Sequence, residues 1–292
     1  MRFLKKGDAV GLISCSDGWN SSDKPSLDYI VRVLSSLGLN VRIAETIFQL
    51  KNTPFSGSPI QRATELMKLF RDPEIRMIFD VSGGDSANQI LPYLDYAAIQ
   101  QSQAVFCGIS DLTVVTNSLY SQCGHRSIHY RIKNLTGDCA AEQLNWFKAA
   151  FMKDGSIPAI DYHWLRGSQM SGVLIGGNLR CALKLAATRY FPDPTDKIIL
   201  LESLGGGAAR TATLLAQLDQ ADVFSKCSGI LLGTFTTMEQ SGAQPSVRKQ
   251  ILGITAPYQL PVAETSQIGH GEDAYGIEIG AMLHFSASAN LQ

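Results

Sequence analysis

Three residues that lie far apart along the chain have the types and the order required for nucleophilic catalysis. Ser110 follows the apolar run AVFCGI, Glu202 ends the run KIILLE, and His270 lies between two glycines in SQIGHGEDAYG. A serine attacks a carbonyl carbon when a base takes its proton, and an imidazole oriented by a carboxylate is such a base. The order serine, acid, histidine is that of the α/β-hydrolases. The three residues therefore suggest acyl transfer through a covalent intermediate.

Each of these residues also has an ordinary structural explanation. Ser110 stands where a predicted strand turns into a predicted helix, a place where serine is common as an N-cap. The corner resembles the nucleophile elbow of hydrolases in its logic, but Leu112 replaces the second glycine of the G-x-S-x-G string. Glu202 could serve a helix cap or an ion pair, and His270 could be an exposed loop histidine. The local pattern favours the cap for Ser110 and leaves the other two residues open.

A glycine pair, Gly83 and Gly84 in VSGGDS, follows another predicted strand and precedes a predicted helix. Adjacent glycines let the backbone approach a ligand closely, and amides at a helix start can donate to a developing negative charge. A tight turn between strand and helix explains the same spacing. In open parallel sheets the ligand crevice lies outside the carboxyl ends of the strands, so this corner and that of Ser110 both lie where a site is expected.

The elements expected to position these residues alternate between strand and helix over the first half of the chain. Apolar runs predict strands at 8–14, 40–45, 75–82 and 103–109. Helical spacing predicts helices at 26–38, 58–72, 85–96 and 111–124. This alternation predicts an α/β fold of flavodoxin-like or Rossmann-like type, in which helices cover both faces of a parallel sheet.

The alternation changes after about residue 135, which indicates two domains, as a length of 292 residues also suggests. Residues 1–135 are expected to form an N-terminal α/β domain that carries the nucleophile. Residues 136–168 are expected to form a linker with one helix from Ala140 to Met152, and residues 169–292 a smaller C-terminal α/β domain that carries the acid and the base.

Composition and charge argue against several classes of function. The formal net charge is -1 without a basic stripe, which argues against a nucleic-acid partner. No run approaches the ~20 apolar residues of a membrane span, and the N-terminus has no signal h-region, so we expect a soluble cytoplasmic protein without a membrane partner. The six cysteines are scattered singly, which indicates reduced core thiols, and no ligand cluster suggests a metal or a cofactor.

Six short blocks, in the right order and with compatible spacing, resemble the LD-carboxypeptidases of serine peptidase family S66. This family includes murein tetrapeptide carboxypeptidases and microcin C self-immunity peptidases. The blocks are, in chain order, LKKGDAVGLIS, SGGDSANQILPYLDYAAI, GISDLTVV, GVLIGGNL, IILLES and GHG. The resemblance covers nearly the whole chain.

The resemblance implies roles for the residues introduced above. Ser110 would be the nucleophile, His270 the general base and then the general acid, and Glu202 the group that orients His270. The backbone amides of Gly84 and Asp111 would form the oxyanion hole. Because an elbow serine begins a helix, the resemblance favours the nucleophile over a purely capping role.

The resemblance also implies a substrate and how it is bound. Gly83, Asn178 and Arg131 are candidates for substrate binding, with Arg180 and Arg210 as further candidates for its carboxylate. The substrate would be a small peptide whose scissile amide joins an L-centre to a D-amino acid, such as meso-diaminopimelate and D-alanine. The C-terminal domain would be of swivelling-barrel type. Cofactors would not be needed, and family members are often homodimers.

Departures from the family pattern fall near the expected crevice and leave the substrate open. Ile109 stands where the family has an aromatic residue, and Tyr130 and Arg131 replace a Gly-Pro pair. The first alternative is a microcin C-type immunity peptidase that cleaves aminoacyl-nucleotide conjugates, with Trp146 or Trp164 as a platform for the nucleobase. The second alternative is a non-catalytic ligand-binding module on the same scaffold.

Overall fold

A six-stranded sheet with the strand order β11-β5-β4-β3-β1-β2 lies at the centre of the first half of the protein. The structure is a computed structural model and describes residues 3–153 and 157–287. The strands from β5 to β2 are mutually parallel, and β11 is antiparallel to β5. The strands are β1 (Ala9–Ile13), β2 (Asn40–Ile43), β3 (Ile75–Asp80), β4 (Val105–Gly108), β5 (Ser127–His129) and β11 (Ile277–Ile279). The carboxyl ends of β4 and β5 therefore lie side by side at one edge.

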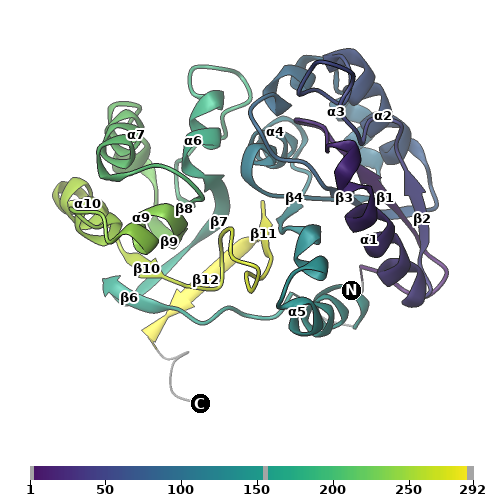
Figure 1. Cartoon of the computed structure of the whole chain (residues 1–292). Coiled ribbons are helices and arrows are strands. Elements are labelled where there is room, and N and C mark those ends of the chain that lie inside the picture. The colour runs from purple at the N-terminus through teal and green to yellow at the C-terminus, as the bar shows by residue number, and fades with distance from the viewer. Residues whose placement is uncertain (1–2, 154–156, 288–292) are drawn as a thin grey trace.

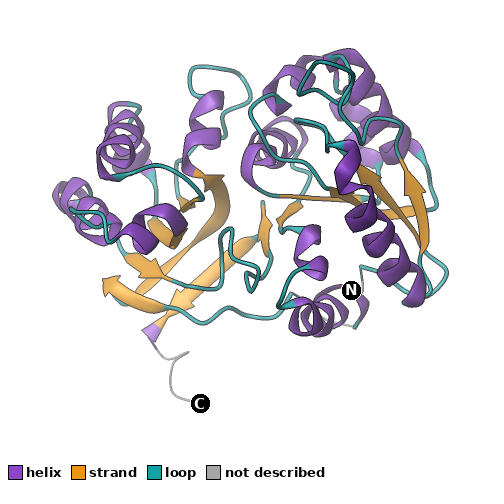
Figure 2. Ribbon diagram, viewed as in Figure 1, coloured by secondary structure: helices purple, strands orange, loops and turns teal. Residues whose placement is uncertain are grey.

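Helices cover both faces of this first sheet (Figure 2). Because successive residues of a strand point to opposite faces, Ile13 packs with α2 and α4 while Leu12 packs with α1 and α5. The helices are α1 (Lys24–Ser36), α2 (Pro59–Arg71), α3 (Tyr96–Gln101), α4 (Thr113–Cys123) and α5 (Ala140–Phe147), which continues as a π-helical turn, η5 (Lys148–Met152). The 3₁₀ turns are η1 (Ser21–Asp23), η2 (Ala87–Tyr93), η3 (Ser110–Leu112) and η4 (Ile132–Thr136).

The second sheet has the order β12-β7-β8-β9-β10-β6 and curls into a half-barrel beside the first (Figure 1). Strands β7 to β10 are parallel, and β12 and β6 are antiparallel edges. The strands are β6 (His163–Arg166), β7 (Gln169–Asn178), β8 (Lys197–Ser203), β9 (Gly229–Phe235), β10 (Val262–Glu264) and β12 (Met282–Ser286). The helices are α6 (Leu179–Ala182), η6 (Leu183–Leu185), α7 (Ala208–Gln220), α8 (Val223–Lys226), α9 (Thr236–Ser241), α10 (Val247–Ile254) and η7 (Ala256–Tyr258).

Strand β8 shows how the second sheet directs its side chains. Ile199 and Leu201 point to the face covered by α7, α8 and α10. Ile198 and Leu200 point to the other face, where they pack with Ile277 of β11. Glu202 continues this second row, because side chains alternate along a strand. The carboxylate therefore points to the face that meets the first half of the chain.

The α/β fold predicted from the sequence is confirmed by both sheets and their helices. Helix α2 begins at Pro59, at the start of the predicted helix, and Ser58 and Gln61 form a capping box there. The segment 85–96, predicted as one helix, instead forms η2, and α3 begins only at Tyr96. Pro92 explains the interruption, since it has no N–H to continue a helical ladder.

The chain returns from the second sheet to the first near its C-terminal end. Strand β10 pairs with β9, β11 then pairs with β5 of the first sheet, and β12 pairs with β7 again. The loop 265–276, which carries His270, is therefore anchored to a different sheet at each end (Figure 1). Within residues 3–153 and 157–287, no helix is both long and apolar enough to cross a membrane.

Candidate active site

Ser110 stands just beyond the carboxyl end of β4, at the corner that leads into α4. Its φ is +62°, in the left-handed region that an L-residue rarely adopts. The corner is tight, because a Cβ on Gly108 would lie 2.8 Å from Cβ of Leu112. This is the strained strand-to-helix geometry of a nucleophile elbow, formed here without the second glycine of the usual string.

The interpretation of Ser110 as a helix N-cap is wrong. The N-cap of η3 is Ile109 and that of α4 is Leu112, and neither helix start has a side-chain cap hydrogen bond. Ser110 is half-buried, and within the described part of the chain its Oγ has no hydrogen-bond partner. A strained residue whose hydroxyl has no structural partner is typical of a functional position.

Glu202 and His270 form a buried pair. Glu202 is fully buried, and its Oε2 lies 2.6 Å from Nδ1 of His270. The other ring nitrogen, Nε2, is buried and has no partner among residues 3–153 and 157–287. Since a carboxylate accepts, the geometry assigns the imidazole proton to Nδ1 and leaves the Nε2 lone pair available to accept a proton.

Residues from both halves of the chain hold the loop that carries His270. Gly269 has a φ of +152°, and a Cβ there would lie 1.9 Å from Oγ1 of Thr234. From the first half, Arg131 donates from Nη1 to the carbonyl of His270 at 3.4 Å, and Asn134 donates from Nδ2 to the carbonyl of Gly271 at 3.1 Å. Arg131, a candidate for substrate binding, thus contacts the loop of the proposed base in this structure.

The glycine pair forms a second corner at the carboxyl end of β3. Gly84 has a φ of +126°, and a Cβ there would lie 2.2 Å from Cγ of Asp17, so both the backbone conformation and the close approach require glycine. The carbonyl of Gly83 accepts from the amide of Asp17 at 3.1 Å, and the carbonyl of Gly84 accepts from Arg180 at 3.2 Å. The Gly84 N–H has no acceptor in the part of the chain that the structure describes.

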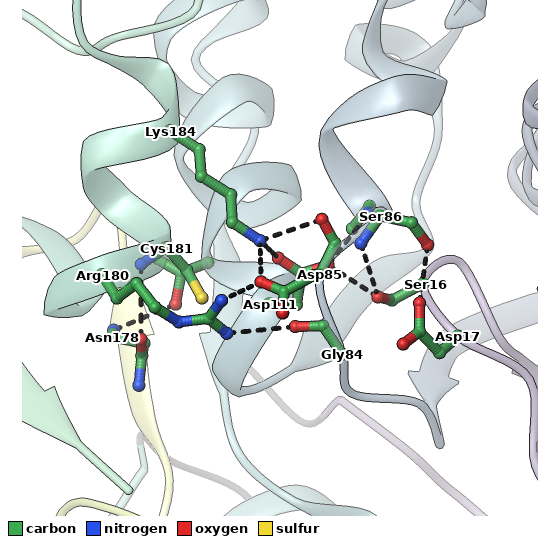
Figure 3. Close-up of polar contacts among 12 residues, drawn as sticks. Ser16, Asp17, Gly84, Asp85, Ser86, Asp111, Asn178, Arg180, Cys181 and Lys184 are labelled. Atoms are coloured by element: carbon green, nitrogen blue, oxygen red, sulfur yellow. Dashed lines mark hydrogen bonds and ion pairs between the residues drawn. The ribbon is translucent and has the colours of Figure 1, made fainter. Parts of the chain in front are cut away.

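Asp111 is fully buried and lies at the centre of the polar cluster shown in Figure 3. Its Oδ2 accepts from Oγ of Ser16 at 2.6 Å and from the amide of Ala87 at 2.7 Å, and its Oδ1 accepts from Nζ of Lys184 at 2.5 Å. A buried carboxylate needs such donors because it has lost its hydration. Ala87 begins η2 behind the glycine pair, and Asp111 follows Ser110, so the cluster ties the two corners together.

Three other candidate residues from the sequence analysis are a helix cap, an exposed arginine and a core tryptophan. Asn178 ends β7 and caps α6, because its Oδ1 accepts from the amide of Cys181 at 3.3 Å. Arg210 is exposed on α7. Trp146 is buried in the core of the first half and stacks on Tyr275, with ring centroids 5.5 Å apart. The suggestion that Trp146 offers a platform for a nucleobase is therefore wrong in this structure.

His129 is a site residue that sequence reasoning missed. It ends β5, opposite Gly108 of β4, and it is fully buried with its Nε2 3.8 Å from Oε1 of Glu202. Neither ring nitrogen has a hydrogen-bond partner in the described residues. The rule that directed attention to Ser110, a polar residue at the carboxyl end of a buried strand, applies equally to His129 and could have found it.

Burial lowers the pKa of His129 to about 4, because the ring loses hydration that its protonated form requires. In the unfolded chain its pKa is about 6.5, so protonation favours unfolding, and stability is lost as pH falls from about 6.5 to about 4. Replacing His129 by Phe should therefore reduce the loss in unfolding free energy between pH 7.5 and pH 4.5 by about 2 kcal/mol. Urea unfolding at both pH values measures this. His284→Phe, at an exposed position of β12, is the control and should lose as much unfolding free energy between the two pH values as the wild type does. An equal loss in His129→Phe and in the wild type would contradict the prediction.

The arrangement contains the groups that acyl transfer requires. Ser110 and Gly84 stand at neighbouring corners of the first sheet, and the second sheet and its loop supply Glu202 and His270. Among the residues that the structure describes, Nε2 of His270 has no hydrogen-bond partner, so Ser110 and His270 are not hydrogen-bonded in this structure. Catalytic hydrogen bonds of this kind commonly tighten only when substrate binds.

Family profiles match most of the chain. The profile of the LD-carboxypeptidase N-terminal domain matches residues 10–130, and that of the LD-carboxypeptidase C-terminal domain matches residues 171–285. The chain therefore belongs to the LD-carboxypeptidase family, serine peptidase family S66. The resemblance noted from the six sequence blocks is confirmed.

Two relatives that match most of the chain carry names for different activities. The chain is 24% identical to the murein tetrapeptide carboxypeptidase of Pseudomonas aeruginosa, over 84% of this chain and 83% of that protein. It is 23% identical to the microcin C7 self-immunity protein MccF of Escherichia coli, over 96% of this chain and 91% of that protein.

Solved structures show the same fold. MccF in complex with aspartyl sulfamoyl adenosine superposes with a TM-score of 0.88 at 21% identity, over 98% of this chain and 95% of that one. The muramoyltetrapeptide carboxypeptidase from Oxalobacter formigenes superposes with a TM-score of 0.81 at 22% identity, over 95% of this chain and 94% of that one. Both likenesses confirm the two-sheet α/β architecture.

Proposed function

We propose that this protein is a serine-type LD-carboxypeptidase that hydrolyses the amide bond between an L-centre and a terminal D-amino acid in small murein peptides. The observation that carries the proposal is the Glu202–His270 pair, with 2.6 Å between Oε2 and Nδ1 and an Nε2 that is free to take a proton. Membership of the LD-carboxypeptidase family and the strained corner at Ser110 support it.

The mechanism follows from these positions. Ser110 Oγ attacks the carbonyl carbon while His270 Nε2 takes its proton, and Glu202 stabilises the imidazolium through Nδ1. The amides of Gly84 and Asp111 donate to the oxyanion. His270 then protonates the leaving amine, so that the D-amino acid departs and the acyl group stays on Ser110. Water, deprotonated by His270, repeats the attack and releases the shortened peptide.

The choice of a murein substrate depends on the positions of two tryptophans. A microcin-type activity needs a surface on which a nucleobase can stack. Trp146 is instead buried against Tyr275. Trp164, on β6, is half-buried and packs edge-on against Tyr162, with ring centroids 5.9 Å apart. The names of the relatives include both activities, since the murein tetrapeptide carboxypeptidase matches 84% of the chain and MccF matches 96%, so the choice rests on the two tryptophans and on the assay below. We further propose that the protein acts in the cytoplasm as a homodimer, on peptides released during wall turnover.

A paired assay tests the substrate. Purified protein is incubated with an LD-tetrapeptide that ends in meso-diaminopimelyl-D-alanine and, separately, with aspartyl sulfamoyl adenosine, and the products are followed by mass spectrometry. We expect release of D-alanine, with kcat/KM at least about 100-fold higher than for the nucleotide conjugate, because a pocket that pairs one substrate's polar groups rejects another by such factors. Turnover of the conjugate alone would reassign the protein as an immunity peptidase, and turnover of neither would favour a binding module.

A further inference from the structure

Two cationic side chains of the second half reach across to the first-half corners that carry the site. Arg180 lies in α6 and Lys184 in η6, four residues later, directly after the strand β7. Figure 3 shows both side chains pointing to the loop of Gly84 and Asp85 and to Asp111. The proposed mechanism gives neither cation a task, although both are largely shielded from solvent.

The ammonium group of Lys184 has three protein acceptors. Nζ donates to Oδ1 of Asp111 at 2.5 Å, to Oδ1 of Asp85 at 2.9 Å and to the carbonyl of Asp85 at 3.0 Å. An ammonium has three hydrogens, so these contacts satisfy it completely. The side chain of Lys184 is 18% exposed and that of Asp111 is not exposed at all, so their attraction is only weakly screened.

Arg180 adds a second contact to the glycine corner. Its Nη2 donates to the carbonyl of Gly84 at 3.2 Å, and its Nη1 donates to the carboxylate of Asp85. The carbonyl of Gly84 belongs to the peptide unit that follows the unpartnered Gly84 amide. Holding this carbonyl therefore restricts rotation of the backbone at the residue whose N–H is proposed to meet the oxyanion.

Lys184 contacts Asp85 and Asp111, which adjoin or supply the two backbone amides proposed to bind the oxyanion. Asp85 follows Gly84, and Asp111 both supplies an amide and follows Ser110. We propose that Lys184, assisted by Arg180, is a positioning residue that holds the Gly84 and Asp111 amides at the spacing that one oxyanion requires. This inference rests on the proposed function, because it assigns those two amides to the oxyanion hole.

The contact between Lys184 and Asp111 also joins the two halves of the chain. Lys184 lies in the half of the chain that also supplies Glu202 and His270, whereas the two amides belong to the other half. One ammonium thus fixes the position of the oxyanion-binding corners relative to the base. Without it, the buried carboxylate of Asp111 would lose its cationic partner and, within the described part of the chain, would keep the Ser16 hydroxyl and the Ala87 amide as donors.

Labelling with a fluorophosphonate tests this inference apart from the natural substrate. In that reaction Ser110 Oγ bonds to phosphorus, fluoride leaves, the serine proton goes to His270, and the phosphoryl oxygen takes the oxyanion position. We expect Lys184→Met in the full chain to lower the labelling rate and kcat about 10- to 100-fold, with KM within about threefold, because deleting one donor outright costs 10²–10³. Lys184→Arg should restore both rates to within about threefold of the wild type, because it keeps the charge.

The control is Lys226→Met, which removes a lysine paired with Asp222 at 3.8 Å on the surface, and it should leave both rates unchanged. A labelling rate for Lys184→Met within twofold of the wild type overturns the inference, as does a loss that lies wholly in KM. If Lys184→Met does not fold, Arg180→Gln applies the same test to a more exposed contact: about 3- to 10-fold slower labelling supports the inference, and an unchanged rate overturns it. If wild-type protein is labelled at Ser110 yet leaves the LD-tetrapeptide intact, the proposed substrate fails while the labelling rates still decide the role of Lys184.

Discussion

Replacing Ser110 by Ala is expected to lower kcat about 10⁴-fold or more while leaving cooperative unfolding intact, because the variant lacks the atom that forms the acyl bond. The substitution removes one hydroxyl that has no hydrogen-bond partner among the described residues, so the fold loses no hydrogen bond. Steady-state release of D-alanine and urea unfolding measure the two effects. Ser36→Ala, at an exposed position of α1, is the control and should keep full activity.

A glycine at the same position separates catalysis from backbone strain. The left-handed conformation costs an L-residue about 1–2 kcal/mol, and glycine adopts it freely. Glycine also increases the entropy of the unfolded chain by about 0.4–1 kcal/mol, so Ser110→Gly should be inactive and more stable than Ser110→Ala by roughly 0.5–1 kcal/mol. Full activity in either variant would disprove the nucleophile. A Gly variant less stable than the Ala variant would show that the corner is not strained.

Replacing Glu202 by Gln should lower kcat about 10⁴-fold, with a smaller effect on KM, because the group that orients the base loses its charge. Glu202 is fully buried and accepts at 2.6 Å from Nδ1 of His270. The amide nitrogen of Gln would donate to Nδ1 and so place the imidazole proton on Nε2, the atom that must accept from Ser110. Steady-state kinetics with the LD-tetrapeptide measure the loss.

A second carboxylate in the same sheet provides the matched control. Glu264 ends β10 and is buried, its Oε1 accepts from Nε of Arg248 at 2.7 Å, and its Oε2 lies 2.8 Å from Nε2 of the exposed His163, so it is a second buried glutamate beside a histidine at a different strand end. Glu264→Gln should keep kcat within about twofold of the wild type, since this pair lies outside the proposed reaction path. Equal losses in Glu202→Gln and Glu264→Gln would mean that the loss reflects damage to the sheet and not to the base.

The fold could be predicted because local patterns report it, whereas the contact between Glu202 and His270 follows from the resemblance to the family, since the local pattern leaves both residues open. Apolar runs that end in Ser110 or Glu202 place these residues at the carboxyl ends of buried parallel strands, where sites form. The glycines beside His270 mark a loop in which the backbone must turn sharply, and the φ of +152° at Gly269 bears this out. The cap interpretation of Ser110 failed because a string of letters does not show that φ is positive there.

The contacts between the two halves of the chain could not be predicted in the same way. Lys184 reads as an ordinary helix lysine, and nothing in its neighbours in the sequence shows that Asp85 and Asp111 will meet it. Arg131 was considered for a substrate carboxylate, yet it donates to the carbonyl of His270, 139 residues away. Such pairings depend on how two sheets are placed relative to each other, and periodicity within one element carries no information on that placement.

Strand β11 limits how this protein can be divided or recombined. It comes from the last tenth of the chain, but it pairs with β5 and covers the edge of the first sheet. Residues 1–135 alone would leave β5 with unpaired backbone groups, a surface on which other chains can add as strands. A chimera that exchanges the second sheet but keeps β11 with its own β5 therefore needs three junctions, one before β6 and one on each side of β11. The segment that forms the first sheet therefore cannot be exchanged or expressed as one continuous stretch of sequence.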